Sequence, residues 1–479
     1  MVDFSLSLAD AISIGRLDAH DQAALAQARA LAPEALVEAA ILRIEALDSA
    51  INAVSFRAFD QALARARKPL SPAPTILNNV PYLVKDSLAY PGMPAGAGSR
   101  SRRDTPSTNI YPFAQALDRA GLVPVGMSTM PEFGLLPSTE SLRSGPTRNP
   151  WAPALSVGGS SGGAAAAVAA GMVPLAHASD AAGSIRMPAS CCGVLGLKPT
   201  RGAHLRARAP HWLDDLLCSD SLIARSVRDL ALGSVITGAI SDAEPPQAGR
   251  RLRIGVMVED MGGRRPHPEV AAAIDRMAGV CADLGHEVAP MRRPDEHAAF
   301  LDALYDVLWP YLGFDVTSAA LAGRSDMAPS DLLEPWTLGL AQICEGLDPL
   351  RLERGVAAIM RAGDEQAGVF QNIDVILSPV LAAPPPPLGQ LAPTRPVDEL
   401  MEAVSSYMCF TPLQNMAGNP ALSVPSGRAS NGGPIGAMFS AGRGQERQLL
   451  WLADEIGRVA PWDIAPALGE VVHDARRHA

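Results

Sequence analysis

Lysine is scarce in this sequence, since only Lys68, Lys85 and Lys198 occur among its 40 basic residues. The other 37 are arginines, which are scattered along the chain rather than clustered. With a net charge of −10, this pattern argues against nucleic acid or an anionic membrane surface as a partner. A lysine kept in such a chain can do what arginine cannot, because a buried ammonium group can lose its proton.

Other features are missing as well. The six cysteines, which include the adjacent pair Cys191 and Cys192, have no disulfide-framework spacing, and we expect reduced thiols. No HExxH or CxxC pattern occurs, so we expect no metal and no cofactor. The N-terminus, with Asp3 and Asp10, lacks a secretory pattern, and no apolar run is long enough to cross a bilayer. We therefore expect a cytoplasmic protein that does not associate with membranes.

The chain is organised around a glycine-rich stretch at residues 158–199. It begins with G-G-S-S-G-G, which contains Ser160 and Ser161. Alone, such a hexapeptide is more often a flexible loop or an anion-binding helix N-terminus. Here an alanine-rich helix, expected at 164–170 and ended by Gly171, follows directly. A flexible linker would not lie between Trp151 and an apolar helix, and a phosphate loop needs a Gly-Lys-Ser/Thr ending that is missing here, so both alternatives are disfavoured.

A second Gly-Ser turn, Gly183-Ser184, lies beyond this helix and continues into Ile185 and Arg186. Two serines in tight turns on either side of one short helix can come close together in space. This arrangement favours nucleophilic chemistry by a serine, and a serine nucleophile needs a base.

Lys85 is the candidate base, because V-P-Y-L-V-K-D reads as a buried strand that ends in a charged pair. An ordinary strand-end salt bridge with Asp86 is an equally good interpretation of Lys85 alone. Lys68 ends a polar helix and is expected to be solvated, while Lys198, before Pro199, is expected to be structural.

Lys85, Ser160 and Ser184, in this order and context, resemble the amidase signature family, in which the two serines are likewise 24 residues apart. The resemblance covers most of the chain. Its further matching segments are G-M-S-T-M-P-E-F (126–133), R-N-P-W (148–151), C-G-V-L-G-L-K-P-T (192–200), D-V-I-L-S-P (374–379) and N-M-A-G-N-P-A-L-S-V-P (415–425).

The resemblance implies an α/β fold, namely a single large domain with a mixed central β-sheet surrounded by helices. We expect an N-terminal helical segment at 1–66, with an apolar stripe from Phe4 to Ile12, and a proline-rich connection at 69–74. The α/β domain then covers 67–479, with a variable helical region at about 295–370 over the site. Other expectations are an active-site loop (201–221), a strand (252–258), a helix (268–284), a strand (286–289), and closing strands (415–441) before an exposed helix.

The resemblance also implies a mechanism. Ser184 attacks a carbonyl carbon, Ser160 (after a cis peptide bond) relays the proton, and neutral Lys85 receives it. The backbone N–H groups of Ala181, Ala182, Gly183 and Ser184 form the oxyanion hole. Asp180 and Arg186 brace the turn as an ion pair.

Three positions depart from the family pattern. Ala182 stands where the family has glycine, and it either strains the loop, if a positive φ is needed, or merely stiffens it. Asn79 also replaces a glycine and tolerates a left-handed backbone. Met438 replaces a glutamine, which leaves the polarity of the pocket open.

The stretch 176–193 most resembles the branch that contains 6-aminohexanoate-cyclic-dimer hydrolases and bacterial urethanases. This resemblance implies cleavage of secondary amides or carbamates with apolar or aryl flanks. Met127, Met130, Gly134, Trp212 and the aromatic residues at 305–314 are the expected substrate contacts. The expected partner is a small-molecule amide or carbamate, and the protein is expected to be a monomer or a homodimer.

Three alternatives are weaker. A Ser-His-Asp triad of Ser184, His177 and Asp180 is disfavoured because the residues are too close in sequence and no G-x-S-x-G is present. A subunit of a tRNA-dependent amidotransferase, or an inactive scaffold, is disfavoured because no partner-binding tail is evident and all reactive residues are present. A narrow amidase for small primary amides is the third alternative.

Overall fold

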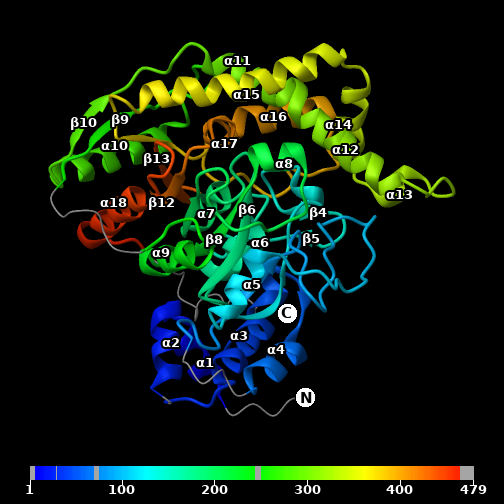
Figure 1. Cartoon of the computed structure of the whole chain (residues 1–479), viewed down its shortest axis with the longest axis vertical. Coiled ribbons are helices and arrows are strands. Elements are labelled where there is room, and N and C mark those ends of the chain that lie inside the picture. Colours follow the sequence, from blue (N-terminus) through cyan, green and yellow to red (C-terminus); the bar gives the residue numbers. More distant parts are fainter. Residues whose placement is uncertain (1–5, 29, 69–74, 243–249, 464–479) are drawn as a thin grey trace.

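The computed structural model describes residues 6–28, 30–68, 75–242 and 250–463. Figure 1 shows a central sheet with the N-terminal helices at one end of the molecule and the helices of residues 297–369 at the other. Phe4 and the proline-rich connection at 69–74 lie outside the described residues.

The sheet has 11 strands in the order β1-β3-β2-β6-β8-β7-β12-β13-β11-β9-β10, and a second sheet pairs β4 with β5. It is mixed, because β2 is parallel to β3 and β6 whereas β8 is antiparallel to β6 and β7. Its strands are β1 Val54–Arg57, β2 Pro81–Lys85, β3 Val123–Ser128, β6 Leu175–Asp180, β7 Leu195–Lys198, β8 Ser219–Ala224, β9 Arg253–Val256, β10 Glu287–Pro290, β11 Val375–Pro379, β12 Ala421–Arg428 and β13 Pro434–Ala441; the pair is β4 Glu140–Ser141 and β5 Gly145–Pro146.

Helices cover the sheet. Those before residue 295 are α1 Leu8–Gly15, α2 Ala19–Gln27, α3 Ala35–Ile51, α4 Phe59–Ala66, α5 Pro112–Arg119, the 3₁₀ turn η1 Glu132–Gly134, α6 Gly162–Ala169, α7 Arg186–Cys192, α8 Trp212–Leu217, α9 Val227–Ile236 and α10 Pro268–Asp283. Those after it are α11 His297–Ala303, the π-helical turn η2 Leu304–Leu308, α12 Trp309–Leu321, α13 Pro329–Leu332, α14 Pro335–Glu345, α15 Pro349–Val369, α16 Val397–Tyr407, α17 Pro412–Ala417 and α18 Glu446–Val459.

The central helix α6 is buried along its whole length, which suits its composition of alanine and glycine with a single valine, Val168. Small side chains let it pack closely, and it lies in one apolar cluster with α3 and with strands β2, β3 and β6. This packing holds both ends of α6 in place, and Ser160 and Ser161 lie immediately before it.

The structure confirms several expected elements and corrects others. The predicted strand–helix–strand order appears as β9, α10 and β10, and residues 297–369 are largely helical. Within 1–66, however, β1 is a strand at the sheet edge, and the expected loop at 201–221 contains α8. The C-terminal helix α18 was expected to be exposed, but it packs through Leu449, Leu452 and Ile456 into the core. The division of the chain at residue 66 stays a prediction.

Candidate active site

The two serine turns meet at the carboxyl end of β6. Strand β6 ends at Asp180, the chain turns through Ala181–Ser184, and α7 begins at Arg186. The N–H of Ser161 donates to the carbonyl of Ser184 at 3.2 Å, so the turn before α6 lies directly beside the turn before α7. The peptide bond between Gly159 and Ser160 is cis, as the resemblance implies.

Lys85 is the last residue of β2 and reaches into the same place. Its Nζ is hydrogen-bonded to Ser160 Oγ at 2.7 Å and to Ser179 Oγ at 2.9 Å. Lys85 and Ser160 are buried, and Ser184 is 6% exposed. The structure thus brings together the three residues that the sequence analysis selected, and adds Ser179.

The pKa of Lys85 is lowered to about 7, mainly by burial and then by the nearby charge of Arg208. The alternative of a salt bridge with Asp86 is wrong, because the Asp86 carboxylate accepts the N–H groups of Gly96 and Gly98 instead. A large share of Lys85 is therefore neutral near neutral pH, as a proton acceptor must be.

Asp180 and Arg186 form the predicted ion pair, with Arg186 Nε 2.9 Å from Asp180 Oδ2. Burial opposes ionisation of Asp180, but Arg186 outweighs it and lowers the pKa to about 2. Asn415 completes the brace, since its Nδ2 donates to Asp180 Oδ1 at 2.8 Å and its Oδ1 accepts from Arg186 at 2.6 Å. The Sδ of Met438 also contacts Arg186, at 3.3 Å. The buried ion pair therefore holds the turn.

The predicted oxyanion donors differ from one another. The N–H of Gly183 donates to Asp180 Oδ1 at 2.7 Å, so the prediction that this N–H faces a substrate oxygen is not supported by its geometry. For the N–H groups of Ala181, Ala182 and Ser184, no acceptor is found in the described part of the chain. These three remain available as donors.

The shape of this turn explains its residues. Gly183 has a φ of 133°, and a Cβ there would lie 2.2 Å from Thr411 Oγ1, so glycine is required. Ala182 has no positive φ and is therefore not strained, whereas Asn79 does adopt the left-handed conformation (φ 57°). Thr411 Oγ1 donates to the carbonyl of Ala182 at 2.6 Å and anchors the loop.

The predicted substrate contacts separate into two groups. Gly134 lies beside Ser160, because a Cβ on Gly134 would be 3.1 Å from Ser160 Oγ, and Met130 is buried next to it. Trp212 instead lies at the surface, 40% exposed, with its ring 5.4 Å from that of Tyr311. In the described structure, the ring contacts of Trp212 are with His211 and Tyr311, and no hydrogen bond joins it to Lys85 or to the two serines.

Most of the aromatic residues of the helical region are packing residues. Tyr305 and Trp309 are buried, and each donates to a backbone carbonyl, that of Met408 and Leu135 respectively. Trp336 donates to the same Leu135 carbonyl at 2.9 Å. These contacts fix the loop after Met130 against the helices instead of leaving the rings free to line a cleft.

Sequence reasoning missed Ser179, Thr411 and the environment of His177. The ring of His177 contacts Lys85 and Asp220 rather than Ser184, so the Ser-His-Asp alternative is wrong. One feature of the sequence could have indicated Ser179: it lies two residues after His177, and residues two apart on a strand point to the same face.

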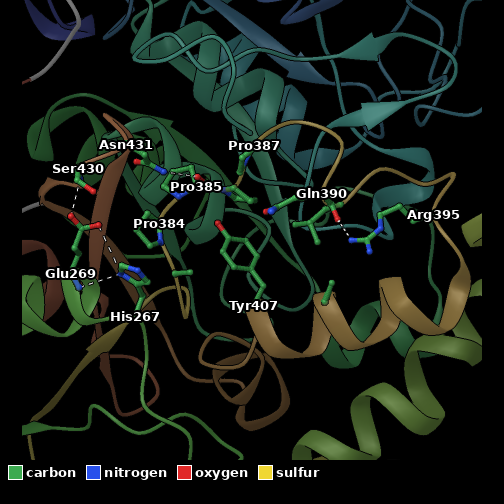
Figure 2. A pocket seen from close by; sticks show the side chains of 14 residues that line it. His267, Glu269, Pro384, Pro385, Pro387, Gln390, Arg395, Tyr407, Ser430 and Asn431 are labelled. Atoms are coloured by element: carbon green, nitrogen blue, oxygen red, sulfur yellow. Dashed lines mark hydrogen bonds and ion pairs between the residues drawn. The ribbon is translucent and has the colours of Figure 1, made fainter.

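A cavity of about 590 Å³ lies elsewhere (Figure 2). Pro384–Pro387, His267, Arg395 and Tyr407 are among its walls, and none of the reactive residues lines it. The hydroxyl of Tyr407 lies 3.6 Å from the Sγ of Cys191 on α7. All six cysteines are free, and among the described residues no group of three or more His, Cys, Asp or Glu is placed to hold a metal ion. Nor does any described helix combine the length and apolar character needed to span a bilayer.

A buried lysine with a lowered pKa beside two serine turns can support nucleophilic catalysis by a serine. Comparison with known proteins identifies the family: the family model described as Amidase matches residues 35–450, and the chain belongs to this family. It is a hydrolase that acts on carbon–nitrogen bonds.

Similar proteins and solved structures agree with this family assignment. AmiC of Mycobacterium tuberculosis is 33% identical over 470 residues, which cover 96% of this chain and 94% of AmiC. The 6-aminohexanoate-cyclic-dimer hydrolase of Pseudomonas sp. is 33% identical over 489 residues, covering 93% and 95%. The structure of a 6-aminohexanoate cyclic dimer hydrolase with substrate has a TM-score of 0.84 at 30% identity, covering 94% of this chain and 98% of that one.

Proposed function

We propose that the protein hydrolyses amides and carbamates through an acyl-enzyme on Ser184, with Ser160 and Lys85 as the proton relay. The observation that carries this proposal is the buried hydrogen bond of 2.7 Å between Lys85 Nζ and Ser160 Oγ, next to the Ser184 turn. A lysine with a pKa of about 7 can accept a proton there, which a permanently charged lysine cannot.

In the first half-reaction, Ser184 Oγ attacks the carbonyl carbon as its proton passes to Ser160, whose own proton passes to Lys85. The carbonyl oxygen becomes an oxyanion that accepts the N–H groups of Ala181, Ala182 and Ser184. One such donor is typically worth about 3 kcal/mol in the transition state. The N–H of Gly183 does not reach the oxyanion; its hydrogen bond to Asp180 helps to hold the turn in shape.

The tetrahedral intermediate collapses when the C–N bond breaks. The leaving nitrogen takes a proton from Ser160, which recovers one from the Lys85 ammonium, and an acyl group remains on Ser184. Water then attacks the ester carbonyl, gives its proton to the same relay, and releases the acid. A carbamate forms the same tetrahedral oxyanion, so the same groups serve it.

The apolar surroundings of the turn support substrates with apolar or aryl flanks. Ala182 and Met187 share one buried cluster with Leu135 and Leu136, next to Met130 and Gly134. The hydrolase relatives are named for a cyclic dimer of 6-aminohexanoate, a secondary amide. Secondary amides and carbamates are therefore favoured over small primary amides, and the expected partner is such a small molecule.

The covalent site is tested with a fluorophosphonate probe followed by peptide mass mapping. We expect one label on the peptide that contains Ser184, and none after Ser184→Ala. Ser234→Ala is the control, since this buried serine donates to the Leu230 carbonyl within α9, away from the site, and its loss should still allow labelling. Label on Ser160 or Ser161, with Ser184 unmodified, would overturn the assignment.

The substrate class is tested with a hydrolysis panel: an anilide, an N-aryl carbamate, the cyclic 6-aminohexanoate dimer, an unsubstituted primary amide and a p-nitrophenyl ester. Ser184→Ala provides the blank for each. Turnover of the anilide and the carbamate is expected. Turnover of the primary amide alone would show a narrow aliphatic amidase, or, if glutamine were preferred, an amidotransferase-type ammonia source.

A further inference from the structure

The backbone of Lys85 has an unusual partner. Pairing between the parallel strands β2 and β6 runs through Tyr82–Leu175 and Leu83–Ala176. Two residues on, the N–H of Lys85 donates to the ring nitrogen Nδ1 of His177 at 3.3 Å. The ring of His177 therefore accepts the Lys85 N–H at the point where the backbone pairing of β2 with β6 has ended and the Lys85 side chain extends toward Ser160.

The same strand also holds the other end of Lys85. Ser179 lies two residues after His177, so both side chains point to the same face of β6. Ser179 Oγ is 2.9 Å from Lys85 Nζ, while His177 accepts the Lys85 N–H. Strand β6 therefore fixes both the backbone and the amine of Lys85.

Strand β8 lies beside β6 (Figure 1), and its residue Asp220 holds the ring of His177. Its Nε2 lies 3.1 Å from Asp220 Oδ1, and Arg208 Nη2 lies 2.6 Å from each oxygen of Asp220. The N–H of Asp220 donates to His204 Nε2, and the ring of Phe113 packs against His177 at 5.2 Å.

This arrangement determines which nitrogen of His177 carries the proton. Arg208 and His177 outweigh the effect of burial and lower the pKa of Asp220, so Asp220 is a carboxylate that only accepts hydrogen bonds. Nε2 therefore carries the proton, and Nδ1 is left as an acceptor. Burial also lowers the pKa of His177, which keeps the ring neutral.

We propose that His177 is a positioning residue for Lys85, with Asp220 fixing the tautomer of its ring and Arg208 fixing Asp220. The proposal rests on the proposed role of Lys85 as the base. Among the described residues, no hydrogen bond joins His177 to Ser160 or Ser184; it acts on the reaction through the backbone of Lys85.

The charges of this group also act on Lys85. Besides burial, Arg208 lowers the pKa of Lys85, whereas the carboxylates of Asp220 and Asp180 raise it. Cys218 carries no charge there, because burial raises the pKa of its thiol well above the usual value. Loss of Arg208 alone would leave the Asp220 carboxylate unopposed, and the pKa of Lys85 would rise.

The first test compares two variants of His177 by the rate at which a fluorophosphonate labels Ser184 as a function of pH. Asn can place Oδ1 near the position of Nδ1 and still accept the Lys85 N–H, whereas Leu cannot. We expect His177→Leu to lower the labelling rate by about tenfold or more, and His177→Asn to recover most of it.

His286 provides the matched control. Its Nδ1 likewise accepts a backbone N–H, that of Leu252, at 3.3 Å, and its ring is buried beside Trp451 at the far edge of the sheet. His286→Leu should lower the melting temperature as His177→Leu does, but should leave the labelling rate of folded protein unchanged.

The second test uses Arg208→Gln, which removes the charge of a side chain that is 27% exposed but keeps an amide that can donate to Asp220. We expect the acid limb of the labelling profile to shift to higher pH. Arg206→Gln, two residues earlier, removes an exposed pair with Asp215 and should cause no shift. If His177→Leu does not fold, the shift of the labelling profile in Arg208→Gln becomes the test of the positioning role.

The outcomes separate the two proposals. Wild-type protein that is not labelled on Ser184 would overturn the proposed function itself. Normal labelling of the wild type, with an unchanged rate in His177→Leu or an unshifted profile in Arg208→Gln, would overturn the positioning role alone. A tenfold loss in His286→Leu as well would show that any buried histidine of this sheet has the same effect.

Discussion

Lys85 carries the sharpest prediction at the scale of single residues. Its amine has to be neutral to accept a proton, and its pKa is about 7 in the folded protein. Activity should therefore rise with pH through about 7 and level off above it. Lys85→Arg should lose at least about 10³-fold in kcat, like Lys85→Met, because a guanidinium keeps its charge and cannot accept the proton.

The measurement is kcat/KM against pH for the wild type and both variants, with the folded fraction checked by circular dichroism. Lys68→Arg, at an exposed position, is the control and should keep full activity. Substantial turnover by Lys85→Arg would mean that Lys85 is an electrostatic group rather than the base.

Thr411 gives a second prediction at this scale. Its hydroxyl donates to the carbonyl of Ala182, and both residues are buried. Thr411→Val keeps the shape but leaves that carbonyl unpaired, which costs about 1–3 kcal/mol. We expect kcat to fall about tenfold, because the oxyanion loop loses its anchor.

The control for this variant is Thr237→Val, which removes an equally buried hydroxyl that donates within α9. Its melting temperature should fall while kcat stays the same. Equal losses of kcat in both variants would show that Thr411 has no specific role in the loop.

At the scale of elements, α14 is attached to the loop after Met130 by a pair of buried carboxyl groups. Glu132 accepts the N–H of Glu334 and the hydroxyl of Thr337, and Glu334 accepts the N–H of Leu142. Burial, and then the charge of Glu132, raise the pKa of Glu334 to about 8; Arg100 opposes this. The pKa of Glu132 is raised as well, mainly by burial.

A raised carboxyl pKa means that the folded state holds its proton longer than the unfolded state. The free energy of unfolding should therefore fall as pH rises from about 4.5 to 8, by at most about 1.4 kcal/mol per pH unit for each such carboxyl group. Glu334→Gln keeps the acceptor for Leu142 but cannot ionise, so it should be the more stable protein at pH 8.

Thermal unfolding of both proteins at pH 5.5 and pH 8 measures this effect. Glu345→Gln, at an exposed position of the same helix, should follow the wild type. An identical pH dependence in the wild type and in Glu334→Gln would show that Glu334 is ionised throughout this range.

At the scale of the whole molecule, the described residues before position 67 (6–28 and 30–66) share the core with the rest of the chain. Strand β1 pairs with β3, and Leu36 of α3 is fully buried in one cluster with Tyr82, while Ile41 lies in another with Leu83. Each such side chain contributes about 1.5–3 kcal/mol, and a whole domain is stable by only about 5–15 kcal/mol. The fragment 67–479 should therefore fail to fold.

Expression of this fragment, followed by thermal unfolding and hydrogen exchange, checks the prediction. In a complementary experiment, a separate 1–66 peptide is added to the fragment. Binding of this peptide should restore folding, because it supplies the missing part of the core. A fragment that unfolds cooperatively on its own would show that residue 66 is a true domain boundary.

The sequence was sufficient to single out Lys85, Ser160 and Ser184, whereas the mixed sheet was implied by the resemblance to the amidase signature family. The three residues stand out through local patterns: tight turns need glycine, a buried strand is apolar, and a base that must be neutral cannot be arginine. The ion pair of Asp180 with Arg186 could also be predicted, because the two residues are only six positions apart in the sequence.

Only the tertiary structure decided what surrounds these residues. Thr411 is 229 residues from Ala182, and Lys85 is 94 residues from Ser179 and 92 from His177. It also placed Trp212 at the surface and directed the Gly183 N–H to Asp180. A single hydroxyl or ring nitrogen leaves no periodic trace in a sequence, because its partner is chosen by which strands and helices pack together. That choice depends on the burial of the whole apolar surface, so it exists only in the folded chain.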